Sequence, residues 1–529
     1  MNHPTNLSSK FDHVVVLMLE NRSFDNLLGY LYEDHVPEGK TFEGLQGKTI
    51  KMPVPSDANG YDKHPYIEPS QAADYHQPYP DPGEVYQHVN TQLFNEISPG
   101  NKKTEACKMV SPYNIPNPLP PKDDLMKGFV KDYINTLEAL KDSKFNNPTF
   151  DQYKVIMQCF KPSQIPVLTT LAKEFAVFDH WFCSVPSQTW CNRAFWHAGT
   201  SGGNVVNPTD ECGLEDIVKG LEAWVKDVWS QKNLFERMAE NNISHAVYTE
   251  DIVSLTALVN GLFNDEQVVR TGKNLKRFKE DIQNGTLPQY AFIEPKFYEQ
   301  HNDQHPSSSG SHFVDGRTKV GTVLLGEALI QDLYNTIRTS TYANNTLLII
   351  TYDEHGGCFD HVPPPCTNFQ SEYPCSKQEH QGVQKDFGFS RLGVRVPMVM
   401  VSPWIQKNTI INEAFEHSSF IKTMCERWGM QGLTERDKKA PSFNSSKLFS
   451  DSKRDLPYIA PPTIPKVEDA DYDQEPLNDL QRSILLGANY VAQQNSTFQM
   501  EFMEMDTVKR IHTVGGAVRH LNSIKQFLK

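Results

Sequence analysis

The sequence predicts an α/β fold in which a mostly parallel sheet is flanked by helices. Residues 11–19 and the run TLLIITY at residues 346–352 are apolar and rich in β-branched side chains, as in strands buried on both faces. Residues 321–338 carry apolar side chains at spacings of three and four, which indicates an amphipathic helix before the second strand. Alternation of strands and helices along the chain favours a parallel sheet with helices on both faces.

The other elements are expected from the same patterns. Residues 163–178 read as a helix followed by a strand, and the segment RAFWHAGTS as the start of a helix. Further strands are expected at 245–256, 289–294 and 394–401, and further helices within 214–242 and at 413–428. Residues 40–125 are rich in Pro, Gly, Asp, Asn and Tyr, so long ordered loops are expected there.

Three segments are expected along the chain. Residues 1–430 form the main domain, residues 431–475 are a Pro- and Asp-rich, linker-like stretch, and residues 476–529 are a C-terminal helical appendage.

Composition excludes several classes of protein. The chain has 529 residues, of which 38% are hydrophobic and 22% charged, so a globular protein is expected. A net charge of -14 argues against nucleic-acid binding and against simple electrostatic docking to anionic lipid. No apolar stretch reaches the roughly 20 residues of a transmembrane helix. The nine cysteines include no CxxC pair, which excludes a zinc ribbon, and Cys366 and Cys375 are a candidate disulfide.

The N-terminal residues lack the basic and apolar regions of a secretory signal peptide. We therefore expect a protein that acts in the cytoplasm, leaves the cell by a non-classical route, or has had a signal removed.

Two predicted strands end in polar pairs, Glu20-Asn21 and Asp353-Glu354. If the strands are neighbours, three carboxylates and a carboxamide converge, and their mutual repulsion would be relieved by a divalent cation. Each pair alone is more often a turn or helix cap at a strand end. Together they favour a metal site.

A hydroxyl group is the candidate nucleophile. Thr189 lies in a loop before a predicted helix, where backbone N–H groups favour an alkoxide and a phosphate anion. A nearby cation would lower the pKa of the hydroxyl further. The alternatives are an ordinary helix-capping threonine and the competing hydroxyl of Ser187.

Several histidines accompany these motifs. His301 and His305 flank Asp303 in a predicted loop, and the others are His312, His355, His361 and His417. An imidazole can donate to phosphoryl oxygens or protonate a leaving alkoxide, although for each one a structural role is equally expected.

The motifs FDHVVVLMLENRSFDNLLGY, FCSVPSQTWCNR, NDQHP and TYDEHGGCFDHVPPP, in this order, resemble the bacterial phospholipase C/acid phosphatase phosphoesterase family. That family includes the plant non-specific phospholipases C, and the resemblance spans about residues 11–430. It implies an alkaline-phosphatase-like fold and a metal-dependent phospholipase C. Such an enzyme would cleave phosphatidylcholine-type phospholipids to diacylglycerol and a phosphorylated head group. One or more divalent ions are implied, and Zn, Ca, Mg, Mn and Fe all remain open.

The resemblance also implies residue roles. Metal ligation falls to Glu20, Asn21, Thr189, Asp353 and Glu354, and Thr189 is in addition the nucleophile that forms a phosphothreonine intermediate. The phosphoryl group is held by His305 and His312, and the substrate-binding candidates are His361, His301 and Asn192.

Three positions depart from the family pattern. Glu84 stands where the family often has His, so a phosphate contact is either missing or supplied by His76 or His88. The loop after His305 is longer than usual, and Cys191 replaces a common Pro.

Two other functions remain open on the sequence. One is an acid phosphatase acting on small phosphomonoesters with the same residues. The other is an inactive homologue that binds lipid or a partner protein. The expected partners are a phospholipid substrate and a peripheral membrane contact.

Overall fold

The computed structural model describes residues 10–103, 105–140, 143–209, 213–263, 268–306, 322–367, 384, 386–445, 447–464, 474–496 and 504–528. The statements below concern these residues.

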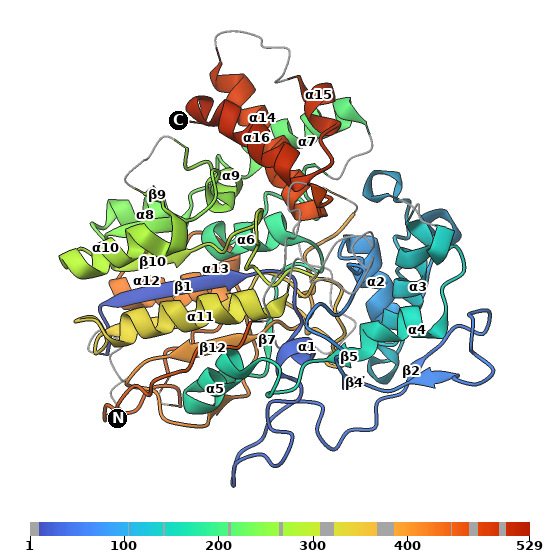
Figure 1. Ribbon diagram of the computed structural model, residues 1–529, viewed down its shortest axis with the longest axis horizontal. Coiled ribbons are helices and arrows are strands. Elements are labelled where there is room, and N and C mark those ends of the chain that lie inside the picture. The colour runs from blue at the N-terminus through green and yellow to red at the C-terminus, as the bar shows by residue number, and fades with distance from the viewer. Residues whose placement is uncertain are drawn as a thin grey trace.

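An eight-stranded sheet forms the centre of the molecule (Figure 1). Its order is β13-β6-β12-β11-β1-β10-β8-β9. The strands are β1 (His13–Leu19), β6 (Ala176–Phe178), β8 (His245–Thr249), β9 (Val269–Thr271), β10 (Tyr290–Ile293), β11 (Thr346–Tyr352), β12 (Met398–Val401) and β13 (Thr409–Ile411). All neighbours are parallel except β12, which is antiparallel to both β11 and β6. The predicted mostly parallel sheet is confirmed.

Helices cover both faces of the sheet. α11 (Val323–Arg338) lies in front of the sheet in Figure 1, and α12 (Ser418–Trp428) and α13 (Glu435–Lys439) lie behind it. α5 (Pro166–Glu174) joins α11, because Glu327 of α11 accepts hydrogen bonds from the first-turn amides of Val167 and Leu168. α6 (Thr189–Ala198) packs against α12. Strands buried on both faces explain the unbroken apolar run of β1.

Some predicted boundaries move, each for a local reason. The segment 40–125 is not loop alone, because α2 (Tyr86–Phe94) forms within it and packs on α3 (Phe129–Ala139). α6 begins at Thr189, four residues before the predicted start. The strand expected at 245–256 ends at Thr249, since Ser254 caps α9 (Leu255–Asn260).

Two elements near the end of the predicted catalytic segment also have bounds that differ from the predicted ones. β12 occupies only the second half of 394–401. The helix expected from residue 413 begins at Ser418, because β14 (Phe415–Glu416) first pairs with β7 (Trp181–Phe182).

The remaining elements are short or peripheral. They are α1 (Phe24–Leu28), α4 (Phe150–Tyr153), α7 (Leu214–Asp227), α8 (Leu234–Glu240), α10 (Lys276–Asn284), β2 (Met52–Pro53), β3 (Tyr66–Ile67), β4 (Ser70–Gln71) and β5 (Gln158–Cys159).

The C-terminal residues are helical. α14 (Asp479–Asn495), α15 (Met505–Lys509) and α16 (Val514–Ile524) gather over α7 and α9 at the top of Figure 1. α14 also contacts α6, where Trp190 Nε1 donates to Ser483 Oγ at 2.9 Å. Within the described part of 431–475, Phe443, Phe449 and Ile459 belong to the main hydrophobic core. That part of the stretch expected as a linker therefore packs in the same core as the strands of the sheet.

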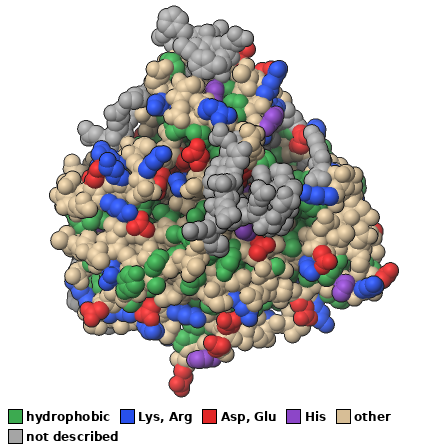
Figure 2. All heavy atoms as spheres, viewed as in Figure 1, with side chains coloured by type: hydrophobic (Ala, Val, Ile, Leu, Met, Phe, Trp, Pro, Cys, Tyr) green, Lys and Arg blue, Asp and Glu red, His purple; other side chains and the backbone are tan. Residues whose placement is uncertain are grey.

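On the face shown in Figure 2, acidic and basic side chains are interspersed among uncharged ones. None of the described helices combines the length and the apolar character that a membrane crossing requires. Cys366 is disulfide-bonded, whereas Cys375, its candidate partner, lies outside the described residues.

Candidate active site

The two polar pairs lie side by side at one edge of the sheet. β1 and β11 are parallel neighbours with Leu19 opposite Tyr352, so Glu20 and Asp353 leave the sheet together. Asp353 Oδ1 accepts hydrogen bonds from the amides of Asn21 at 3.2 Å and of Glu354 at 2.8 Å. The predicted convergence of the two strand ends is what the structure shows.

A glycine permits this close approach. Gly356 has φ of +60°, and a Cβ added there would lie 2.2 Å from the carbonyl oxygen of Asn21. Only a residue without a side chain fits both this backbone conformation and this contact.

Thr189 contacts the first of the two pairs. It is the first residue of α6, and its hydroxyl donates to Glu20 Oε2 at 3.2 Å. Thr189, Glu20 and Asp353 are all 0% exposed. The hydroxyl of Ser187 is buried and forms no hydrogen bond with any described residue. Of the two candidate hydroxyls, Thr189 is therefore the one in contact with Glu20.

Arg193 is a charged member of the site that the sequence did not single out. It forms ion pairs with Glu20 and, through Nε at 3.4 Å, with Asp353. It lies four residues after Thr189, hence on the same face of α6. This spacing is the signal by which the sequence could have identified it.

Burial dominates the electrostatics of the acids. It raises the pKa of Glu20 well above its usual value, with Arg193 opposing the shift and Asp353 adding to it. Burial, followed by the charge of Asp353, also raises the pKa of Glu354. Asn21 Oδ1 and Glu354 Oε1 are buried and accept no hydrogen bond within the described ranges. Crowded carboxylates and unpartnered hard oxygen atoms fit a divalent cation.

Two other groups of side chains have potential ligand atoms within 4.8 Å of one another in the described part of the chain. They are Asp25, Asp360 and His361, and Asp81, Glu84 and His305. The predicted trio Glu20, Asp353 and Glu354 is not such a group. Arg193, paired with Glu20 and Asp353, supplies positive charge between these two acids.

In the first group, the guanidinium of Arg395 already neutralises the carboxylates. Arg395 donates to Asp25 Oδ1 and to Asp360 Oδ1, both at 3.0 Å, and is completely buried. The Nδ1 of His361 forms a hydrogen bond with Asp25, and its Nε2 lies 3.0 Å from Glu43 Oε1. This network ties α1, which follows Asn21, to the turn that follows Glu354. The structure thus places His361, a substrate-binding candidate, in a network of ion pairs.

The second group adjoins Asn21. His305 Nε2 lies 2.9 Å from Asn21 Nδ2 and 4.0 Å from Glu84 Oε2. Asn21 Nδ2 also donates to Glu84. His88 pairs with Asp132 at 2.8 Å, and His76 lies 3.4 Å from Asp74. Glu84 itself, which the sequence marked only as a departure, contacts the predicted site.

The other predicted residues have these positions. His301 pairs with Asp303 at 2.6 Å; burial lowers the pKa of His301, but the carboxylate outweighs it and raises this pKa to about 9. The amide of Asn192 bonds the backbone of Val185, Ser187 and Gln188, so it braces the loop before Thr189. His312 lies outside the described residues.

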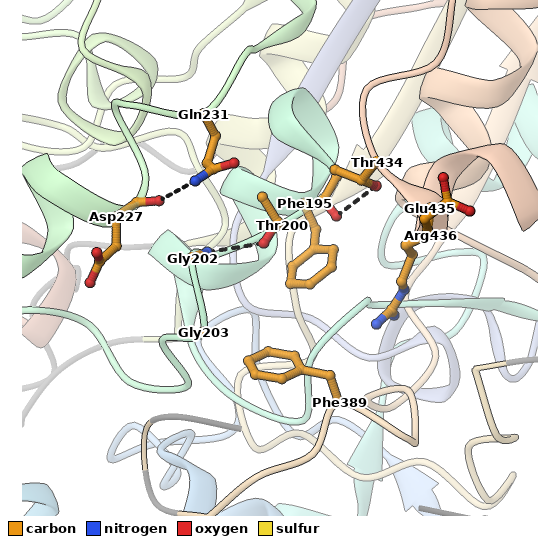
Figure 3. A pocket seen from close by; sticks show the side chains of 11 residues that line it. Phe195, Thr200, Gly202, Gly203, Asp227, Gln231, Phe389, Thr434, Glu435 and Arg436 are labelled. Atoms are coloured by element: carbon orange, nitrogen blue, oxygen red, sulfur yellow. Dashed lines mark hydrogen bonds between the residues drawn. The ribbon is translucent and has the colours of Figure 1, made fainter. Parts of the chain in front are cut away.

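A cavity of about 400 Å³ lies at the far end of α6 (Figure 3). Phe195 and Phe389 face one another there, with ring centroids 6.0 Å apart, beside Arg436. Thr189 does not line it. Because α6 separates its two ends by roughly 14 Å, this cavity is distinct from the site described above.

The known proteins that this chain resembles in sequence include several phospholipases C. Non-specific phospholipase C6 of Arabidopsis thaliana is 31% identical over 539 residues, covering 98% of this chain and 88% of the relative. Non-specific phospholipase C1 of the same plant is 31% identical and covers 88% of this chain and 75% of the relative. Non-hemolytic phospholipase C of Burkholderia pseudomallei is 23% identical, and the match covers 80% of this chain and 55% of the relative.

Among solved structures, a protein of the alkaline phosphatase superfamily from Vibrio parahaemolyticus matches 51% of this chain and 62% of its own, with a TM-score of 0.30 at 10% identity. The model of one family, described as the Phosphoesterase family, matches residues 11–431. The chain therefore belongs to the Phosphoesterase family.

Proposed function

We propose that this chain is a metal-dependent phospholipase C that cleaves phosphatidylcholine-type phospholipids to diacylglycerol and a phosphorylated head group. The observation that carries the proposal is the contact between the Thr189 hydroxyl and Glu20, beside the Asp353-Glu354 pair. The names of the plant and bacterial relatives support the same activity.

Glu20, Asn21, Thr189, Asp353 and Glu354 would hold the metal. The unpartnered oxygens of Asn21 and Glu354 support this assignment. A divalent cation at such a site neutralises charge on phosphoryl oxygens and favours the alkoxide form of a nearby hydroxyl.

Thr189 would lose its hydroxyl proton and attack phosphorus, and the diacylglycerol oxygen would leave with a proton from a histidine, so that the head group stays on a phosphothreonine. Because Thr189 is the first residue of α6, the positive end of the helix dipole would lie beside the phosphoryl oxygens. Neutral His305, whose pKa is lowered by burial, would orient the phosphoryl group. Water then hydrolyses the phosphothreonine.

A phospholipid panel tests the proposal. Purified protein is incubated with vesicles of phosphatidylcholine, phosphatidylethanolamine and phosphatidylglycerol and, separately, with p-nitrophenyl phosphate. Diacylglycerol and p-nitrophenol are quantified together with the protein's metal content. We expect diacylglycerol from phosphatidylcholine and at least one divalent ion per chain. Hydrolysis of phosphomonoesters alone would replace the proposal with a phosphatase.

A further inference from the structure

His417 is a histidine that contacts the reaction centre although the proposed reaction does not use it. It is completely buried and lies directly after β14 and before α12. Its Nε2 lies 2.6 Å from the backbone carbonyl oxygen of Asp353, and its Nδ1 lies 3.2 Å from Trp181 Nε1. Both ring nitrogens therefore have partners, and neither is left for a phosphoryl oxygen or a leaving group.

These two partners fix the position of the proton on the imidazole. A backbone carbonyl oxygen only accepts hydrogen bonds, so Nε2 of His417 carries a proton. The indole N–H of Trp181 only donates, so Nδ1 has a lone pair. The carbonyl group on one side and the indole on the other thus require the same form of the ring, which is the neutral tautomer with its proton on Nε2.

The surroundings hold this ring in place. β14 pairs with β7, which places His417 beside Trp181. The ring of Trp196 packs edge-on against the imidazole, with the ring centroids 5.5 Å apart. Glu416, the last residue of β14, accepts a hydrogen bond from Ser184 in the segment that precedes α6. The imidazole is therefore fixed to parts of the chain that also lead to the nucleophile.

Asp353 is held by hydrogen bonds on several sides. Its amide donates to the carbonyl oxygen of Leu19 at 3.3 Å, and its Oδ1 accepts from the amides of Asn21 and Glu354. The bond from His417 holds the backbone carbonyl oxygen as well. The backbone of Asp353 therefore cannot rotate without breaking a buried hydrogen bond, and its carboxylate keeps one orientation.

We infer that His417 is a positioning residue that holds the backbone of Asp353 and thereby orients one carboxylate of the proposed metal site. This inference rests on the proposed function and deepens it. Groups that hold a metal ligand in place contribute to metal affinity, and the loss of one typically lowers affinity or activity roughly 10- to 100-fold.

The competing explanation is that His417 only fills the core between Trp181 and Trp196. In His417→Gln the side-chain amide nitrogen can take the place of Nε2 and donate to Asp353. In His417→Asn the shorter side chain reaches only the place of Nδ1. Both variants lose the ring, so a role in packing alone predicts similar losses in both, whereas the inferred role predicts that only His417→Asn is impaired.

Metal affinity is the first readout. Mn²⁺ is titrated into metal-free protein and the free ion is followed by electron paramagnetic resonance, and Zn²⁺ is measured by competition with a chelator. For the ion that the unmodified chain binds more tightly, we expect His417→Asn to bind roughly 10- to 100-fold more weakly and His417→Gln to stay within about threefold. Unchanged affinity in His417→Asn, or equal losses in the two variants, would overturn the inference.

His13→Gln is the matched control. His13 is the first residue of β1, and its Nδ1 lies 2.9 Å from the backbone carbonyl oxygen of Pro288. The substitution removes the same kind of bond, from an imidazole to a backbone carbonyl group, at the opposite end of the strand that leads to Glu20. Metal affinity should stay unchanged, and a loss as large as that in His417→Asn would contradict a specific role of His417.

The tautomer can be measured in the unmodified chain, so this readout does not depend on the folding of a variant. In protein labelled with ¹⁵N at histidine, NMR should show a protonated Nε2 and an unprotonated Nδ1 for His417. Trp181→Phe removes the indole donor but keeps an aromatic ring, so it should shift the Nδ1 resonance and thereby assign it. A proton on Nδ1 in the unmodified chain would overturn the inference.

The two proposals fail in different ways. If the chain hydrolyses phosphatidylcholine but His417→Asn binds metal as tightly as the unmodified chain, the inference is wrong and the proposed activity stands. If only His417→Asn loses metal affinity but the unmodified chain releases no diacylglycerol, the inference is supported and the proposed activity is wrong.

Discussion

The hydroxyl of Thr189 lies 3.2 Å from a carboxylate oxygen of Glu20, although 169 residues separate them in sequence. Glu20 is placed by the end of β1, and Thr189 by the start of α6. Any reaction that uses this hydroxyl therefore depends on the packing of α6 against the sheet, which fixes the two groups relative to each other.

Replacing Thr189 by Ala should abolish turnover while leaving the fold intact. The variant loses the attacking oxygen but only one hydrogen bond, so we expect kcat to fall at least about 1000-fold with little loss of stability. Phosphatidylcholine hydrolysis and thermal unfolding measure the two effects.

Two variants serve as controls for that experiment. Thr189→Ser keeps the hydroxyl and should retain measurable activity, whereas Ser187→Ala should behave like the unmodified chain. If Ser187→Ala were the inactive variant, the nucleophile would have to be reassigned.

Removing divalent metal should stop the reaction reversibly. We expect EDTA to abolish hydrolysis and one of Zn²⁺, Ca²⁺, Mg²⁺, Mn²⁺ or Fe²⁺ to restore it, because the crowded acids of the site would otherwise repel an anionic phosphate. Glu354→Gln should lower the metal content of the purified protein, measured by mass spectrometry. Full activity in the presence of a chelator would leave Arg193 as the cation of the site.

The convergence of Glu20-Asn21 with Asp353-Glu354 could be predicted because it depends on two local facts. Each pair follows an apolar strand, and adjacent parallel strands end at the same edge of a sheet. Thr189 was predicted through the family resemblance, since a threonine before a helix is in itself commonplace.

Contacts that depend on packing could not be predicted in this way. Arg395 meets Asp25 across 370 residues and Asp360 across 35, and no sequence pattern marks those pairs. α2 forms in a stretch rich in Pro and Gly because its residues pack on α3, which outweighs local propensity. The approach of Glu84 to Asn21 is likewise set by the path of a loop.

Gly356→Ala should disrupt the site without touching any titrating group. The added Cβ meets the carbonyl of Asn21, and the positive φ is unfavourable for Ala. We expect an activity loss larger than the loss of stability, because Asn21 must move. Gly285→Ala is a control, since Gly285 also has positive φ but no atom within 4 Å of an added Cβ. Equal effects in the two variants would assign the loss to backbone strain alone.

The stability of the fold should decrease between about pH 6.5 and pH 9. Burial lowers the pKa of His361, but Asp25 and Glu43 outweigh it and raise this pKa to about 9. Below pH 6.5, the usual value, the imidazole is charged in folded and unfolded chains alike, and the ion pairs stabilise the fold fully. Between the two values only the folded chain keeps the proton, so the free energy of unfolding falls as pH rises.

The size of this effect follows from the shift. A rise in the pKa of His361 from 6.5 to about 9 corresponds to roughly 3 kcal/mol of folding free energy. The free energy of unfolding should therefore differ less between pH 6 and pH 10 in His361→Gln, by about that amount. Urea titrations at a series of pH values measure this difference. His64→Gln is the control, because His64 stacks on the uncharged ring of Phe150 and its replacement should leave the pH dependence of stability unchanged. The pKa of His301 is also raised to about 9, so part of the slope should persist in His361→Gln. An unchanged slope would mean that the pair of His361 with Asp25 does not carry a net charge difference between the folded and unfolded states.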